Sequence, residues 1–249
     1  PVRKELGSEI RKMFVAAPGC VLVDADYSQI ELRLLAHISG DETMKNAFLT
    51  GEDIHAVTAS QVFGIPLDEV TPQQRSHAKA VNFGIVYGIS AFSLAQDIGV
   101  RPAEAKAYID AYLEKYHGVR EYMERVISEA KANGYVETLF GRRRPLPELK
   151  SSNFNTRSFG ERVARNMPIQ GTAADIMKLA MVNAHRRIQA EGLRSRLILQ
   201  VHDELIAECP EDEAEHVKAL LEEEMSGAVQ LDVPLTANAK IGHTWAEAH

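Results

Sequence analysis

Two aspartates stand where apolar, strand-like runs end. Asp26 follows the apolar run Cys20–Val23, and Asp203 lies between two apolar stretches within Leu197–Cys209. A carboxylate that ends a buried strand is costly to desolvate unless a positive group meets it. Mg²⁺ prefers carboxylate and phosphate oxygens, and a pair of ions about 3.5–4 Å apart stabilises the attacking and leaving oxygens of a phosphoryl displacement. Taken singly, each aspartate is better explained as a turn residue that accepts backbone hydrogen bonds.

A second pattern combines cations with aromatic rings. Arg75, Lys79, Phe83 and Tyr87 recur at steps of four, which keeps them on one broad face of a helix. Two cations near a helix N-terminus suit a triphosphate, and two aromatic rings further along suit a base or a sugar. A half-buried amphipathic face is the ordinary alternative, but the order of cations followed by aromatics favours a nucleotide.

A third set of polar side chains begins in a basic part of the chain. Seven Lys or Arg residues fall between Gly141 and Arg165, against two acids. Arg162, Asn166 and Gln170 again follow at steps of four. Such side chains can donate to phosphates and to the minor-groove acceptors of DNA, which are degenerate between base pairs and would give sequence-tolerant contact. A solvated polar face is an equally ordinary interpretation.

The secondary structure that must position these residues is predicted to have strands near both ends of the chain and helices between them. Thr71-Pro72-Gln73-Gln74 predicts a capped helix start, with Gly88 past the helix end near Tyr87. Apolar spacing predicts the remaining helices: one from Ile30 to Gly40, a helical stretch over 102–133 with a break at 117–118, a helix over 161–191 interrupted by Pro168 and Gly171, and a surface helix over 211–225. It predicts strands over 20–23 and 233–241, and a hairpin over 197–209 with 202–204 at its turn. This order indicates an α+β fold.

Composition bounds the class of protein. The chain has 249 residues, 45% hydrophobic and 25% charged, which excludes bulk disorder and predicts one large domain or two intertwined lobes. No apolar run has the length of a membrane span, and no signal segment leads the chain. The net charge of −7 argues against a polyanion partner, although eight acids concentrate in 205–226. Cys20 and Cys209 are expected to be reduced core residues of a cytosolic protein. A first residue that is not Met predicts a piece of a longer protein.

Several long segments resemble family A DNA polymerases of bacteria. DYSQIELR (Asp26–Arg33), RSHAKAVNFGIVYG (Arg75–Gly88) and QVHDEL (Gln200–Leu205) are similar to motifs A, B and C of that family, in the same order. DIHAVTA, GYVETLFGRRR and NMPIQGTAAD extend the resemblance over nearly the whole chain. It implies an antiparallel palm sheet with helices over 1–39 and 156–249, and a mostly helical fingers subdomain inserted over 40–155. The family's thumb and a preceding palm segment would lie before residue 1.

The resemblance also implies roles for single residues. Asp26 and Asp203 match the ligands of two Mg²⁺ ions, with the Tyr27 carbonyl assisting and Glu204 close by. Arg75, Lys79 and His55 match triphosphate contacts, and Lys79 is the candidate proton donor. Phe83 matches the residue beneath the incoming sugar and base, Tyr87 a residue that stacks at the template site, and Glu31 the residue that excludes a 2′-hydroxyl. The remaining matches lie along the primer–template minor groove: Arg162, Asn166, Gln170 and His202. Asp24 matches no motif role and is expected to be a bystander.

These observations predict DNA-templated DNA synthesis from dNTPs, in replication or repair, by a cytoplasmic protein that is monomeric in its full-length context. The partners are primer–template DNA and dNTPs, with no membrane. A two-metal nuclease would use the same carboxylates but does not need the Arg–Lys–Phe–Tyr helix, and Glu31 and Phe83 disfavour an RNA polymerase of the phage type. The alternative remains that the chain is a fragment that binds nucleotide or primer–template without efficient turnover.

Overall fold

The computed structural model, which describes residues 5–249, divides the chain into a sheet unit and a helical unit. The sheet unit holds the residues up to Ile30 together with Ala173–Gln230 and Leu235–His249. The helical unit holds Glu31–Thr172 and Leu231–Pro234. The predicted α+β class is confirmed. The two main borders between these units, after Ile30 and after Thr172, each fall within a helix.

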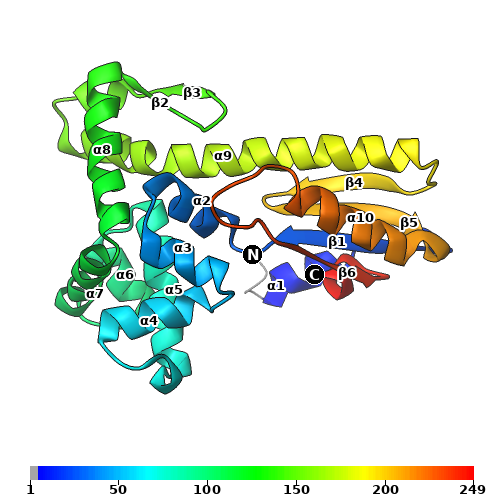
Figure 1. The fold of residues 1–249 in the computed structure, drawn as a ribbon, viewed down its shortest axis with the longest axis horizontal. Coiled ribbons are helices and arrows are strands. Elements are labelled where there is room, and N and C mark those ends of the chain that lie inside the picture. Colours follow the sequence, from blue (N-terminus) through cyan, green and yellow to red (C-terminus); the bar gives the residue numbers. More distant parts are fainter. Residues whose placement is uncertain (1–4) are drawn as a thin grey trace. The chain divides into compact units, whose positions relative to one another are not determined.

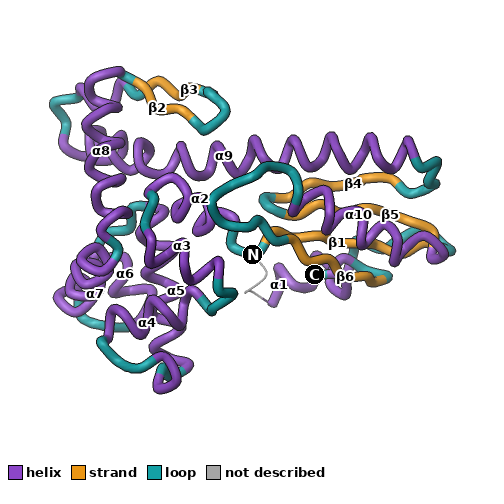
Figure 2. Tube along the Cα trace, in the orientation of Figure 1, coloured by secondary structure: helices purple, strands orange, loops and turns teal. Residues whose placement is uncertain are grey.

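The sheet has four antiparallel strands in the order β4-β5-β1-β6, drawn in orange in Figure 2. The strands are β1 (Cys20–Tyr27), β4 (Arg196–Val201), β5 (Glu204–Pro210) and β6 (Ala237–Gly242). Side chains alternate between the two faces of a strand. Val23, Ala25 and Tyr27 therefore share one face, which helix α10 (Ala214–Ser226) helps to bury. The Tyr27 hydroxyl donates to the Met225 carbonyl of that helix at 2.6 Å.

The opposite face of β1 is also covered. Helix α11 (Trp245–Ala248) packs its Trp245 ring against Leu22 and Ile206. Phe14 meets the Trp245 ring edge-on at 5.4 Å between centroids, and the guanidinium of Arg11 from α1 (Glu5–Lys12) lies 4.3 Å over that ring. The acid Asp24 points to this same covered face, because it follows Leu22 by two residues.

The predicted hairpin at the end of β4 is confirmed. β4 and β5 pair from Arg196 opposite Glu208 to Val201 opposite Glu204, with an irregularity between Leu197 and Leu199. His202 turns the chain with a positive φ of 51°. Asp203 therefore lies in the turn, and Glu204 is the first residue of β5.

The helical unit is built mainly from α3 to α8, which Figure 1 shows in blue to green. These helices are α3 (Glu42–Leu49), α4 (Ile54–Phe63), α5 (Pro72–Tyr87), α6 (Ala91–Ile98), α7 (Pro102–Lys115) and α8 (His117–Asn133), followed by the hairpin of β2 (Tyr135–Glu137) and β3 (Arg143–Pro145). α5 has the predicted bounds: Thr71 and Gln74 form a capping box, and Gly88 ends the helix in the left-handed region.

The predicted break in the long helical stretch falls at Tyr116, between α7 and α8. Gly118 explains why the chain turns there. Its N–H donates to the Asp41 side chain at 3.0 Å, and a Cβ at Gly118 would come within 2.9 Å of the Asp41 Cα. Only glycine allows this close approach. Asp41 in turn caps α3, so one carboxylate fixes two helix starts.

The prediction of an interrupted helix over 161–191 is wrong. α9 runs without a break from Phe154 to Ala190 and contains Pro168. Proline removes one backbone donor, but apolar side chains on both sides of it, Ala164 and Ile176, are fully buried and hold the helix. Gly171 does not break the helix but allows the Thr138 side chain to approach it closely, because a Cβ at Gly171 would lie 2.6 Å from the Thr138 methyl group.

Two smaller differences concern the start of the last strand and the burial of the helix before it. The last strand begins at Ala237, four residues after the predicted start. The predicted surface helix is half-buried, because α10 places Val217, Leu220 and Leu221 in the core. Helix α2 (Ile30–Ser39) ends before Gly40 as expected. None of the helices in the described part of the chain combines the length and apolar character needed to cross a membrane.

Candidate functional site

Three acids share one face of the sheet. Asp24 and Asp26 point to the same side of β1, and Glu204 pairs directly with Asp26 across the β1–β5 ladder. The backbone N–H of Tyr27 donates to the Asp203 carbonyl at 3.1 Å, which fixes the hairpin turn against the end of β1. The structure therefore brings Asp26, Asp203, Glu204 and Tyr27 together, as the sequence predicted.

Burial and crowding of acids dominate the electrostatics of this cluster. The Asp26 Oδ1 atom is buried and has no hydrogen-bond partner among the described residues. Burial raises the pKa of Asp26 to about 7, and the neighbouring charges of Asp203, Glu204 and Asp24 add to the effect. Burial also raises the pKa of Asp203. A set of carboxylate oxygens that is short of positive charge fits a hard divalent cation.

The positive charge that the cluster does have comes mainly from Arg11. Its Nη2 atom donates to Glu204 Oε1 at 3.1 Å, and both side chains are nearly buried. The Arg11 charge lowers the pKa of Asp26, but this effect is smaller than those of burial and the three acids. One guanidinium thus compensates part of the acid cluster.

Asp24 is a full member of the acid cluster, which sequence analysis missed. It is 3% exposed, and its Oδ2 atom accepts from the Trp245 indole N–H at 3.1 Å. Burial raises the pKa of Asp24 to about 6, and the charge of Glu204 contributes. The alternation of Asp24 and Asp26 along the strand was the available signal, since residues two apart share a face.

In the helical unit, α5 presents its two aromatic residues beside Glu31. Phe83 and Tyr87 stack with 6.5 Å between ring centroids and 17° between planes. The Tyr87 hydroxyl donates to Glu31 Oε2 at 2.7 Å. Three of the predicted nucleotide-site residues thus form one connected surface.

The cations of α5 differ in their surroundings. Arg75 is exposed, and its Nε donates at 2.5 Å to Asp53, the residue that also caps α4. Lys79 is partly buried on the next turn. A guanidinium held only by a solvent-exposed carboxylate is bound weakly, so Arg75 remains able to exchange Asp53 for another anion.

His55 is placed deeper than its predicted contact with phosphate suggests. The side chain is 2% exposed and stands at the end of a hydrogen-bonded chain. Thr58 donates to Asn82 Oδ1 at 3.1 Å, so the Asn82 amide nitrogen faces His55 Nδ1 at 3.0 Å. Nδ1 is then an acceptor, and the ring carries its proton on Nε2. Burial lowers the pKa of His55 to about 4, which keeps the ring neutral.

The three polar residues of α9 line one cavity of about 400 Å³ in the helical unit. Arg162, Asn166 and Gln170 form part of its wall, together with Tyr87 and Arg144. The Asn166 Oδ1 atom is buried without a described hydrogen-bond partner. His202, predicted to act with them, lies at the exposed hairpin turn of the sheet unit.

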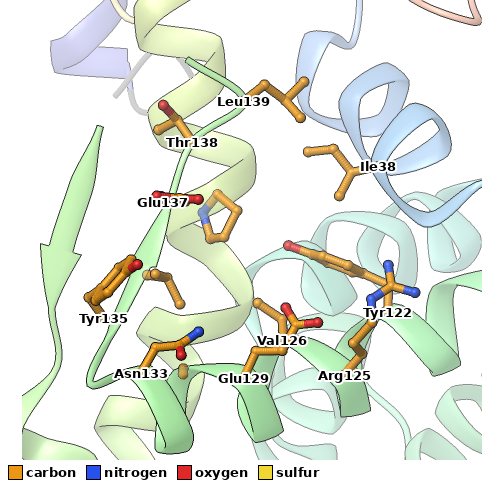
Figure 3. A pocket seen from close by; sticks show the side chains of 13 residues that line it. Ile38, Tyr122, Arg125, Val126, Glu129, Asn133, Tyr135, Glu137, Thr138 and Leu139 are labelled. Carbon is orange, nitrogen blue, oxygen red and sulfur yellow. The ribbon is translucent and has the colours of Figure 1, made fainter. Parts of the chain in front are cut away.

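A second cavity of the helical unit, of about 410 Å³, contains none of the predicted residues (Figure 3). Tyr122, Arg125 and Glu129 of α8 line it on one side, and the segment of Glu137, Thr138 and Leu139 completes the wall. Its lining mixes one cation with two acids and with apolar side chains. This mixture favours no single ligand class, so the cavity has no role in the function proposed below.

An acid cluster on an antiparallel sheet, together with a helix that carries cations and aromatics, is the arrangement expected of a nucleic acid polymerase. Residues 1–247 match the family model described as DNA polymerase family A. The chain belongs to this family.

The relatives agree with that assignment. The chain is 51% identical to DNA polymerase I of Caldicellulosiruptor bescii, over 99% of the chain and 29% of the relative. It is 53% identical to DNA polymerase I of Pseudomonas aeruginosa, over 100% of the chain and 27% of the relative. The chain thus spans less than a third of the length of these relatives. A solved structure, the POL domain of Pol1 from M. smegmatis in complex with DNA primer-template and dNTP, matches 100% of the chain and 44% of that chain, with a TM-score of 0.93 and 47% identity.

Proposed function

We propose that the chain catalyses DNA-templated addition of dNTPs to a primer 3′-hydroxyl, with release of pyrophosphate. The observation that carries the proposal is the buried acid cluster of a family A polymerase, in which Asp26 keeps a carboxylate oxygen without a partner. The M. smegmatis neighbour, solved with primer-template and dNTP, supports DNA and dNTP as partners. The proposal includes a cytoplasmic, monomeric full-length protein and a part in replication or repair.

Asp26, Asp203 and the Tyr27 carbonyl would hold two Mg²⁺ ions. When bound, such ions lower the pKa of an attacking hydroxyl and stabilise charge on the leaving oxygens. The chain itself fixes the carboxylates before any ion binds, through the β1–β5 pairing and the bond from Tyr27 to Asp203. Arg11 holds Glu204 to one side, so this carboxylate has a fixed position next to the metal ligands.

The nucleotide would be held mainly by α5. Arg75 exchanges its Asp53 partner for the triphosphate, and Lys79 donates a proton to the leaving pyrophosphate. Phe83 packs beneath the incoming sugar and base, and Tyr87 stacks at the template site. Glu31 meets the position where a ribonucleotide carries its 2′-hydroxyl. His55 would offer its Nε2–H to a phosphate oxygen, in the neutral state that its lowered pKa enforces.

Primer–template DNA would contact the polar residues of α9 and the hairpin turn. Arg162, Asn166 and Gln170 can donate to phosphates and to minor-groove acceptors, with His202 as a further contact from the sheet unit. Minor-groove acceptors are shared between base pairs, so this contact suits an enzyme that must accept every sequence.

Binding of nucleotide or primer–template without efficient turnover is the second candidate, because the acid cluster and α5 can contact both ligands whether or not a product forms. The two candidates share the same partners and differ only in product formation.

A primer-extension assay beside a gel shift on the same DNA separates these candidates. The chain is incubated with Mg²⁺, a labelled primer–template and one dNTP at a time. The proposal predicts that the primer grows only with the dNTP complementary to the template. A shifted band without extension would support the binding fragment, and neither extension nor a shift would contradict both.

A further inference from the structure

A second group of possible metal ligands lies beside the proposed Mg²⁺ pair in the sheet unit. Asp24, Glu204 and His249 each offer one ligand atom, and these atoms lie within 4.8 Å of one another. His249 Nδ1 is 3.4 Å from Asp24 Oδ2 and 3.4 Å from Glu204 Oε1. Within the described part of the chain, this is the one group of three such side chains with a spacing suited to a metal.

The spacing agrees with coordination of a single ion. A tetrahedral zinc ion about 2.1 Å from each of three ligands keeps the ligand atoms about 3.4 Å apart from one another. The two separations from His249 Nδ1 have this value. The third separation, between the Asp24 and Glu204 oxygens, is within 4.8 Å, so the two carboxylates would move closer together when the ion binds.

Two buried carboxylate oxygens point independently to a missing partner. Asp24 is 3% exposed and Glu204 is 7% exposed. Asp24 Oδ1 and Glu204 Oε2 have no hydrogen-bond partner among the described residues. Asp24 and His249 also line a cavity of about 270 Å³, which Asp26, Ser28, Asn238, Lys240 and Ala248 complete. A buried carboxylate oxygen without a partner is costly, and the cavity has room for an ion with its water.

The local charge favours a cation as that partner. The acids of this face are Asp24, Asp26, Asp203 and Glu204. Arg11 is the cation paired with one of them, while Lys240 donates to the His249 carbonyl at 2.9 Å. A divalent ion would offset the excess of negative charge that the arginine leaves.

We propose that Asp24, Glu204 and His249 form an accessory site for a divalent ion of the zinc type, distinct from the Mg²⁺ pair of Asp26 and Asp203. An imidazole nitrogen with two carboxylates suits Zn²⁺ better than Mg²⁺, which prefers oxygen ligands and keeps its waters. The bound ion links α11 to β1 and β5, and so stabilises the sheet unit next to the catalytic acids. This site does not depend on the proposed polymerase activity.

Zn²⁺ binding is measured by equilibrium dialysis of the full 249-residue chain, with metal analysis and circular dichroism on each preparation. The variants are Asp24→Asn, which can still accept from Trp245, and His249→Ala, whose side chain lies at the surface. His243→Ala is the matched control, because His243 is an exposed histidine of the same segment. Asp203→Asn reports on the Mg²⁺ pair instead.

The expected result is one bound Zn²⁺ in the parent, in His243→Ala and in Asp203→Asn, with affinity lowered about tenfold or more in Asp24→Asn and His249→Ala. Loss of an outer-shell partner alone typically costs tenfold to a hundredfold, so loss of a ligand should cost at least as much. Zn²⁺ should also raise the melting temperature of the parent more than an equal concentration of Mg²⁺ does. Unchanged Zn²⁺ affinity in both ligand variants, or no Zn²⁺ bound by the parent, would overturn the proposal. Loss confined to Asp203→Asn would place the ion in the catalytic pair and overturn it as well.

Discussion

The acids of this chain titrate in opposite directions according to their surroundings. Glu213 accepts hydrogen bonds from Ser195 and Arg194, and these contacts lower its pKa to about 2. Asp26 has no such donors on its buried oxygen, and burial raises its pKa to about 7. The first acid is satisfied by contacts within the protein, whereas the second keeps a buried oxygen without a partner among the described residues, as the proposed metal site requires.

Sugar selection is the first property to test at single residues. Tyr87 holds Glu31 through its hydroxyl, so Tyr87→Phe should leave Glu31 less fixed and Glu31→Ala should remove it. We expect ribonucleotide incorporation to rise in both variants, and more in Glu31→Ala. The measurement is competition between each dNTP and the matching ribonucleotide. Ratios identical to the parent in both variants would show that this pair does not select the sugar.

The ion pair of Arg75 with Asp53 makes a second prediction. Asp53→Asn keeps a residue that caps helices well but removes the competing charge from Arg75. Exposed ion pairs contribute about 0–1 kcal/mol, so dNTP should bind up to about fivefold more tightly. Arg75→Ala should weaken binding about tenfold or more, because a charge-assisted phosphate contact is lost. Single-turnover incorporation against dNTP concentration gives both values. If Asp53→Asn weakens binding as Arg75→Ala does, Asp53 positions the arginine instead of competing for it.

At the scale of elements, local signals predicted α5 and the β4–β5 hairpin because the deciding residues are neighbours in sequence. Thr71, Gln74 and Gly88 fix both ends of α5 without help from distant parts of the chain. Pro168 misled the prediction because the forces that keep α9 continuous come from buried side chains such as Ile176. Local propensity is overridden where burial over a long helix outweighs one lost hydrogen bond.

Gly88 offers a test of how an element end supports the site. It has φ of 66°, and a Cβ there would come 3.2 Å from the Arg162 Cγ atom. Gly99 ends α6 with a similar φ of 71° but has nothing within 4 Å of a built Cβ. Both Gly→Ala changes cost about 1–2 kcal/mol through the left-handed backbone, and Gly88→Ala should cost more. Denaturant unfolding measures the difference. Equal losses of unfolding free energy in the two variants would show that the Arg162 side chain moves away from the new Cβ without destabilising the protein.

At the scale of the whole molecule, charge is distributed unevenly. The net charge of −7 opposes DNA binding, so affinity must come from local basic residues such as Arg144 and Arg162, which line one cavity. Each phosphate contact adds about one to the slope of log affinity against log salt. Arg144→Ala and Arg162→Ala should each lower that slope by about one. Arg194→Ala, whose guanidinium is paired with Asp212 and Glu213, should leave it unchanged. If neither substitution changes the slope of log affinity against log salt, the DNA contacts lie elsewhere on the chain.

Long-range contacts set the limit of what the sequence could predict about the site. Asp26 and Asp203 could be proposed from sequence because each follows an apolar strand, and the two-residue spacing of Asp24 from Asp26 was a further local signal. Arg11 and His249 were missed because their contacts with the acids arise only when β1, β5 and the two terminal helices meet. No local pattern predicts that the histidine directly after the last helix lies 3.4 Å from an acid of the first strand.

The measurement that tests the polymerase proposal most directly is single-turnover incorporation of one correct dNTP by Asp26→Asn, Asp203→Asn and the double variant, with DNA affinity determined on the same preparations. Each carboxylate is proposed to hold the same pair of Mg²⁺ ions, whose charge stabilisation amounts to several kcal/mol. Each single variant should therefore lose about a thousandfold or more in rate, the double variant should lose little further, and DNA affinity should stay close to that of the parent. Incorporation near the parental rate by either single variant would contradict the assignment of the two aspartates as the metal ligands.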